Sequence, residues 1–164
     1  MKSENRQKGM LLVEVLVALL LFVVGILGLV KAMGISQKAM ADTASRSESS
    51  TFASDMVQKI RVAADTSSLA AFQTSLQSFQ HLEISTSPCV FSGTPSANAL
   101  VTAWATDVQS GPHHLPGSSA SMQQILVDTS ATGFNKITVT VCWKGPNDTQ
   151  LRRNTYSAYV NANF

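Results

Sequence analysis

An uninterrupted apolar stretch near the N-terminus limits what this chain can fold into more than any other feature. Residues 10–30 form a run of 21 residues with a single charged side chain, Glu14. As an α-helix with a rise of about 1.5 Å per residue, this run is roughly 31 Å long, which matches a bilayer hydrocarbon core of about 30 Å. The apolar region of a secretory signal is shorter, about 7 to 15 residues. The sequence therefore predicts a transmembrane helix over residues 10–30.

The residues that flank this helix set its orientation. Residues 1–9 carry three basic side chains, Lys2, Arg6 and Lys8, against one acidic side chain, Glu4. Basic flanks stay on the cytoplasmic side, so everything after Val30 is expected to face outward. Of the twelve basic and ten acidic side chains of the chain, nine of each remain after residue 9. The slightly basic composition thus comes from the first nine residues and predicts no nucleic-acid binding, which needs a clustered basic face.

Glu14 is the exception inside the apolar run. A carboxylate in hydrocarbon costs a few kcal/mol and normally has a partner and a function. Glu14 follows Met10 by four residues, and the basic segment ends in Gly9. Cleavage after Gly9 would place a new α-amine on Met10, one helical turn from Glu14. The two charges can then neutralise each other, within one chain or between neighbouring helices, and the helix macrodipole favours a carboxylate in the first turn.

Two other interpretations of the N-terminus compete with this one. The first is a plain signal anchor in which Glu14 has no role. The second is ordinary signal peptidase acting at Ala39-Met40-Ala41. That site lies nine residues beyond Val30, with Lys31 and Lys38 between, which is a poor position for it.

The helix is expected to continue beyond the membrane. Residues 31–64 contain no proline, and Phe52, Met56 and Ile60 recur at four-residue intervals. This spacing is typical of an amphipathic helix whose apolar stripe packs on a core. We therefore expect one helix of about 50 residues, ended by residues 65–68.

The remainder of the chain combines helical and strand-like patterns. Leu69, Phe72, Leu76 and Phe79 predict a short helix capped by Ser68, and Leu100, Trp104 and Val108 predict another. Residues 85–98 are rich in Ser, Thr and Pro and are expected to form a loop. Alternation with a period of two then predicts three strands, at residues 123–128, at residues 136–144 and around Tyr156, Ala158 and Val160, with a turn at residues 145–148 between the last two. The expected fold class is α+β, with a long helix covering one face of an antiparallel meander.

Cys89 and Cys142 are the only cysteines. Both lie on the outward side of the predicted helix, where an oxidising compartment favours a disulfide. In residues 136–144 the side chains of Ile137, Val139 and Val141 share one face, so Cys142 points to the other, toward the loop that carries Cys89. Closing a loop of this length is worth about 4 kcal/mol in the loop-entropy model. Two cysteines this far apart do not have the spacing of metal ligands.

No catalytic constellation is visible in the sequence. The histidines are His81, His113 and His114, and the adjacent pair could not both face one metal from a regular element. There is no Gly-x-Ser-x-Gly elbow and no phosphate-binding glycine loop. We therefore expect no enzyme activity, no cofactor and no metal site.

The N-terminal layout resembles the signature of type IV prepilins. Gly9, Met10 and Glu14 occupy the positions of the cleaved glycine, the first mature residue and the fifth mature residue. The resemblance implies cleavage between Gly9 and Met10 by a prepilin peptidase, N-methylation of Met10 by the same enzyme, and a role for Glu14 in assembly. It also implies a division into a leader (residues 1–9), a transmembrane helix (10–30), its amphipathic continuation (31–64) and a periplasmic head (65–164).

Further segments are similar to minor pilins of the PilV type, the type IV pilus modification proteins. They are residues 13–19 (Val-Glu-Val-Leu-Val-Ala-Leu), Met56 with Ile60-Arg61, Trp104 before Leu115-Pro116-Gly117, and residues 137–143. This resemblance implies the pilin fold and anchoring in the inner membrane. It also implies low-copy incorporation into the pilus and a role in priming or modifying pilus assembly. The implied partners are other minor and major pilins, with a tip adhesin as a further partner.

Two alternatives stay open at this point. A minor pseudopilin of a type II secretion system has a similar leader, although the cysteine pair and the segment from Trp104 to Gly117 favour a pilus protein. A single-pass membrane-anchored periplasmic enzyme or binding protein belongs to a different class, and a catalytic constellation would support it.

Overall fold

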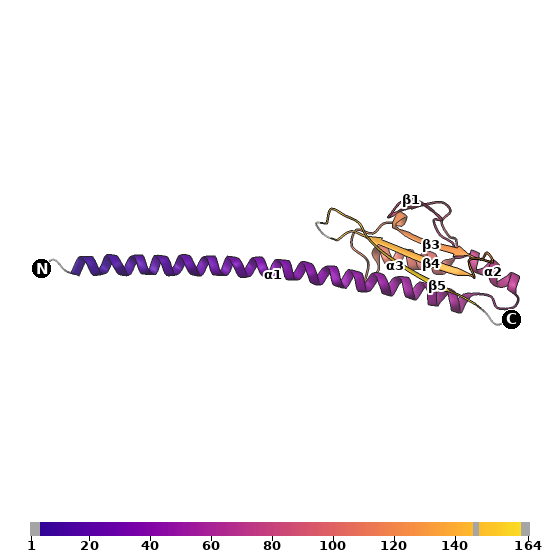
Figure 1. The fold of residues 1–164 in the computed structure, drawn as a ribbon, viewed down its shortest axis with the longest axis horizontal. Helices are drawn as coiled ribbons and strands as arrows, with labels where there is room; N and C mark the ends of the chain where they lie inside the picture. The colour runs from indigo at the N-terminus through magenta and orange to yellow at the C-terminus, as the bar shows by residue number, and fades with distance from the viewer. Residues whose placement is uncertain (1–3, 146–147, 162–164) are drawn as a thin grey trace. The chain divides into compact units, whose positions relative to one another are not determined.

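A single helix, α1 (Glu4–Ala63), makes up the N-terminal part of the chain (Figure 1). The structure is a computed structural model that describes residues 4–145 and 148–161, with only the backbone of residues 4–9. Residues 1–3 of the expected leader, and Pro146 and Asn147 of the expected turn, lie outside the described residues. The helix has 60 residues and begins before Met10. The chain divides into two compact units, residues 1–41 and residues 42–164.

The second unit, which we call the head, combines the end of α1 with two shorter helices and two small sheets. The helices are α2 (Leu69–Gln77) and α3 (Ala99–Ser110). The strands are β1 (Ile84–Ser87), β2 (Val90–Ser92), β3 (Gln123–Asp128), β4 (Lys136–Trp143) and β5 (Arg152–Tyr159), and a short 3₁₀ turn, η1 (Ala120–Met122), precedes β3. The α+β class with a long N-terminal helix and a C-terminal antiparallel sheet is confirmed.

The main sheet is an antiparallel meander in the order β3-β4-β5. Ile137, Val139 and Val141 of β4 are fully buried on the predicted face. In the β3–β4 register Ile125 pairs with Val139, and in the β4–β5 register Ala158 pairs with Ile137. The three strands predicted from period-two alternation are therefore present. The backbone ladder continues one residue past β5, because Val160 N donates to Asn135 O at 3.1 Å.

One hydrophobic core joins α1 to the sheet and to both short helices. Met56, Val57 and Ile60 of the predicted helical stripe are fully buried in it. Burying a side chain of this size contributes roughly 1.5–3 kcal/mol. Trp104 of α3 lies in the same core and donates its indole Nε1–H to the carbonyl of Phe52 at 3.0 Å. The C-terminal part of α1 is thus held from the side by packing and by a directed hydrogen bond.

Polar side chains in the turn between α1 and α2 accept hydrogen bonds that end the first helix and begin the second. Ser68 caps α2 by accepting a hydrogen bond from Ala71 N at 3.2 Å, as predicted. Asp65 accepts a hydrogen bond from Ser67 N at 2.9 Å, and its own N–H donates to Ser75 Oγ at 2.9 Å. The hydrogen bond from the Ser67 backbone, followed by one from the Ser67 side chain, lowers the pKa of Asp65.

The prediction that residues 85–98 form only a loop was wrong. They contain most of β1 and all of β2, which pair antiparallel, with Ser85 opposite Phe91 and a register irregularity between Ser85 and Ser87. Serine, threonine and proline there indicate turns, and β1 has no buried residue that would produce an alternating pattern. The hairpin forms because Phe91 and Cys89 anchor it on the sheet, which is a tertiary effect.

Candidate functional site

The first candidate site is the apolar surface of α1. Every residue from 10 to 41 is exposed in the chain, and the large apolar side chains among them are between 43% and 78% exposed. Among the residues that the structure describes, the stretch Met10–Ala63 is the one helix that is long and apolar enough to cross a membrane. A continuous apolar surface of this size on a folded chain requires lipid or other apolar helices around it.

Glu14 lies on this surface. It belongs to α1, and its side chain is exposed among apolar neighbours. Met10 is four residues earlier, 78% exposed, and residues four apart lie on the same side of a helix. In the uncleaved chain the Met10 nitrogen is a peptide nitrogen of this helix, so the ammonium that would face Glu14 exists only after a cut at Gly9. The three sequence-predicted residues Gly9, Met10 and Glu14 thus fall within two turns of one helix.

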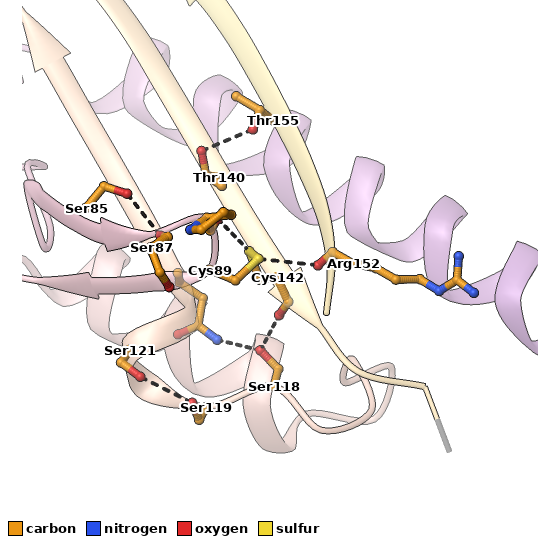
Figure 2. The surroundings of a disulfide bond; sticks show 12 residues. Ser85, Ser87, Cys89, Ser118, Ser119, Ser121, Thr140, Cys142, Arg152 and Thr155 are labelled. Carbon is orange, nitrogen blue, oxygen red and sulfur yellow. Dashed lines mark hydrogen bonds between the residues drawn. A yellow bond between two sulfur atoms is a disulfide. The ribbon is translucent and has the colours of Figure 1, made fainter. Parts of the chain in front are cut away.

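The second candidate feature is the predicted disulfide, which is present. Cys89 and Cys142 are bonded, with their Cα atoms 5.8 Å apart, and both are buried. Figure 2 shows the bridge on the strand that carries Thr140, beside the β1–β2 hairpin with Ser85 and Ser87. It forms a second, smaller hydrophobic cluster with Phe91, packed by Leu82 and Met122. The bridge fastens the hairpin to the side of the sheet opposite the main core.

Hydroxyl and amide groups surround the disulfide. Ser118 Oγ donates to Cys142 O at 2.9 Å and accepts from Gln123 Nε2 at 2.8 Å (Figure 2). Thr140 and Thr155 join their hydroxyls across β4 and β5 at 3.3 Å, also in Figure 2. The hydroxyls of Ser118, Thr140 and Thr155 near the bridge are therefore hydrogen-bonded within the head, whereas the buried Gln123 Oε1 has no partner among the described residues.

An ion-pair network that the sequence analysis missed links α1 to the β4–β5 connection. Arg152 Nε lies 3.0 Å from Asp42 Oδ1 and 3.2 Å from Asp148 Oδ2. The other Asp42 oxygen, Oδ2, lies 3.0 Å from Arg46 Nε. The Asp42–Arg46 pair has the four-residue helical spacing that sequence reasoning can find. The Arg152–Asp42 contact joins residues far apart in the chain and has no local signal.

The three histidines lie in different surroundings. His113 is exposed, and its Nδ1 is 3.4 Å from Glu48 Oε1. His114 is exposed, and its Nδ1 lies 3.1 Å from Gly111 O. His81 is buried. Within residues 4–145 and 148–161 no group of three or more His, Cys, Asp or Glu side chains is arranged to hold a metal ion.

These elements give an exposed apolar helical surface that carries one carboxylate, and a head whose core holds the C-terminal part of the same helix. Comparisons of the chain with protein-family models, with curated proteins and with solved structures give no match.

Proposed function

We propose that this chain is a minor pilin of the type IV pilus, of the PilV type, which primes or modifies pilus assembly by packing its apolar helix against other pilins. In this proposal the helix anchors the uncleaved chain in the inner membrane, with residues 1–9 in the cytoplasm and the head in the periplasm. Prepilin peptidase cuts after Gly9 and methylates the α-amine of Met10. The observation that carries the proposal is Glu14, the one charge in a run of 21 apolar residues, one turn after the Gly9–Met10 bond.

The exposed apolar surface of α1 suits both a lipid bilayer and the interior of a filament, which are apolar. In the membrane, lipid tails cover side chains such as Leu16, Leu20 and Leu27, which are 63% to 64% exposed in the isolated chain. In a filament, neighbouring helices cover the same side chains. Because lipid and packed helices are similarly apolar, the transfer depends on packing and on polar pairs. Glu14 supplies such a pair, since a neighbour's N-terminal ammonium can neutralise it and fix the register between two helices.

The test compares incorporation of wild type and Glu14→Leu, measured as the amount of the protein in sheared pili relative to membranes. Glu14→Leu should be inserted and cleaved but depleted from pili, because the partner's ammonium would be left without a counter-charge, which costs several kcal/mol. Glu14→Asp, with the charge but a shorter side chain, should be intermediate. Val15→Leu is the matched control, an apolar change at the next position, and should incorporate normally.

Three outcomes would overturn the proposal. Equal incorporation of Glu14→Leu and wild type would remove the assembly role of the carboxylate. A mature N-terminus at residue 42, or retention of residues 1–9 in wild-type cells, would exclude prepilin processing. Mass spectrometry of proteins captured with the membrane-embedded chain separates the remaining alternatives, since pilins would support the proposal and secretion-system proteins would assign the chain to a type II system.

A further inference from the structure

His81 is a buried histidine held by one directed hydrogen bond. Its backbone pairs with Ile125 of β3, through His81 N to Ile125 O at 2.9 Å and Ile125 N to His81 O at 3.0 Å. Its side chain accepts a hydrogen bond at Nδ1 from Ser96 N, at 3.1 Å. A backbone N–H can only donate, so Nδ1 must be unprotonated and the proton of the neutral ring must be on Nε2. Nε2 is buried and has no partner among the described residues.

The hydrogen bond from Ser96 fixes the middle of the segment that joins β2 to α3. We call residues 94–98 the connecting segment. Its start is held by Leu82 N, which donates to Thr94 O at 3.1 Å. Ser96 Oγ donates to Ser78 O at 2.8 Å and accepts from Asn98 N at 3.2 Å. Asn98 is also the N-cap of α3 and accepts from Leu100 N. The buried imidazole therefore fixes the backbone N–H of Ser96, and the Ser96 hydroxyl fixes the backbone N–H of Asn98, which caps α3.

Protonation of His81 is incompatible with this arrangement. An imidazolium carries a proton on both nitrogens, so Nδ1–H would face the Ser96 N–H, donor against donor. The positive charge would also be buried. The charged group near the ring is Glu83, which attracts a positive imidazolium, while its Oε2 accepts a hydrogen bond from Thr94 N at 3.0 Å. The other nearby groups named above are uncharged.

We propose that His81 and Ser96 form an acid-released latch: the neutral imidazole holds the connecting segment closed, and protonation of His81 releases it. Release breaks the Ser96 N–H contact and frees Ser96 and Asn98 to leave Ser78, which loosens the start of α3. Burial lowers the pKa of His81, and the attraction of Glu83 opposes this only in part. In the open segment the ring meets water and has its ordinary pKa, about 6.5.

The sign of the pH effect follows from this difference. Because the open form binds the proton more tightly than the closed form, the closed form is favoured fully above about pH 6.5 and loses stability as the pH falls below it. One proton is involved, so the closed-to-open ratio should fall about tenfold per pH unit between the two pKa values.

The test is hydrogen exchange of the full-length chain in lipid nanodiscs, followed by mass spectrometry between about pH 5 and about pH 8, the range in which a histidine changes charge. After correction for intrinsic exchange, peptides that cover the connecting segment should lose protection as the pH falls below about 6.5, by about tenfold per pH unit until the closed form also binds the proton. Peptides from β4 should keep theirs. A segment whose protection does not change with pH would overturn the proposal, and so would equal loss in β4, which means global unfolding.

Three variants identify the titrating group. In His81→Asn the amide Oδ1, bonded to Cγ as Nδ1 is, can still accept from Ser96 N but cannot titrate, so protection should become independent of pH. His114→Gln removes an exposed histidine and should leave the pH dependence unchanged. Glu83→Gln should keep the loss of protection at low pH and extend it to lower pH, because the closed form loses the carboxylate that attracts the imidazolium; if it abolishes the dependence instead, the carboxylate is the switch and the proposal is wrong.

A measurement on the wild-type side chain keeps the test decisive if His81→Asn does not fold. Nitrogen-15 NMR of the imidazoles should show His81 with an unprotonated Nδ1 at neutral pH. Its titration midpoint should lie below the ordinary histidine pKa of about 6.5. A proton on Nδ1, or a midpoint at or above that ordinary value, would overturn the latch.

Discussion

Breaking the Cys89–Cys142 bridge should destabilise the head by several kcal/mol. The bridge closes a loop with a sequence separation of 53 residues. In the chain-entropy model, cross-linking over this separation lowers the entropy of the unfolded chain by about 14 cal/mol/K, which corresponds to about 4 kcal/mol at 25 °C. For a head of this size, that loss corresponds to a fall in Tm of about 15 °C.

The assay uses the two tryptophans of the chain, Trp104 and Trp143. Both belong to the head core, where they are 1% and 2% exposed, and no other tryptophan is present. Their fluorescence therefore reports unfolding of the head without interference from the apolar helix. Urea and thermal unfolding of the full-length protein in detergent are compared for the oxidised protein, the reduced protein and the double variant Cys89→Ser with Cys142→Ser.

The comparison of oxidised and reduced wild type changes only the bond itself. Both should unfold cooperatively, with the reduced protein and the double variant less stable by about 4 kcal/mol. Ser87→Ala, an exposed change in the same hairpin, should stay within about 0.5 kcal/mol of wild type. If the oxidised and reduced proteins differ by less than about 1 kcal/mol, the β1–β2 hairpin is held by packing alone and the reasoning from loop closure is wrong.

Three further changes can be measured with the same fluorescence assay. Met56→Ala leaves a cavity in a fully buried site and should lower the free energy of unfolding by about 2–5 kcal/mol. Val62→Ala on the same helix, where Val62 is 87% exposed, should be nearly neutral. Equal effects of the two changes would contradict the assigned core face of α1. Ser68→Ala removes the cap that accepts from Ala71 N and should cost about 1 kcal/mol, so an unchanged midpoint would mean that the cap has no energetic role. Arg152→Ala should lower the free energy of unfolding by at most about 1 kcal/mol, and by less at high salt, because its ion pairs are partly exposed. Arg153→Ala is the control. A larger loss of stability that does not depend on salt would show that Arg152 acts by packing.

Regular elements with a strong period could be predicted from the sequence. The alternation around Ile137, Val139 and Val141 predicts β4, and the four-residue spacing of Met56 and Ile60 predicts the buried stripe of α1. These patterns are visible because each element buries one face against a single core, so apolar residues recur at the positions that face the core. The disulfide was predictable because only two cysteines are present.

The features that were missed depend on contacts between distant segments. The β1–β2 hairpin contains many small polar residues and no alternating pattern, and its position depends on Cys142, which lies 53 residues after Cys89. The pairing of Arg152 with Asp42 has no local pattern. The burial of His81 follows from its pairing with Ile125 of β3, whereas histidine by itself is found both inside and outside proteins. For the candidate assembly helix the limit is different, because the partner of Glu14 would be another molecule.

The contacts between α1 and β5 join the first and the last elements of the fold, and this determines when the head can be completed. Asn154 Nδ2 of β5 donates to Ser49 Oγ at 3.2 Å, and Arg61 Nη2 donates to Tyr159 O at 3.3 Å, contacts that span 105 and 98 residues (Figure 1). Until β5 has been synthesised, the core that includes Met56 and Ile60 of α1 lacks Ala158. Non-local contacts of this kind close late and slowly. A chain truncated before Arg152 would therefore leave this core incomplete, and such partly folded chains are prone to aggregate.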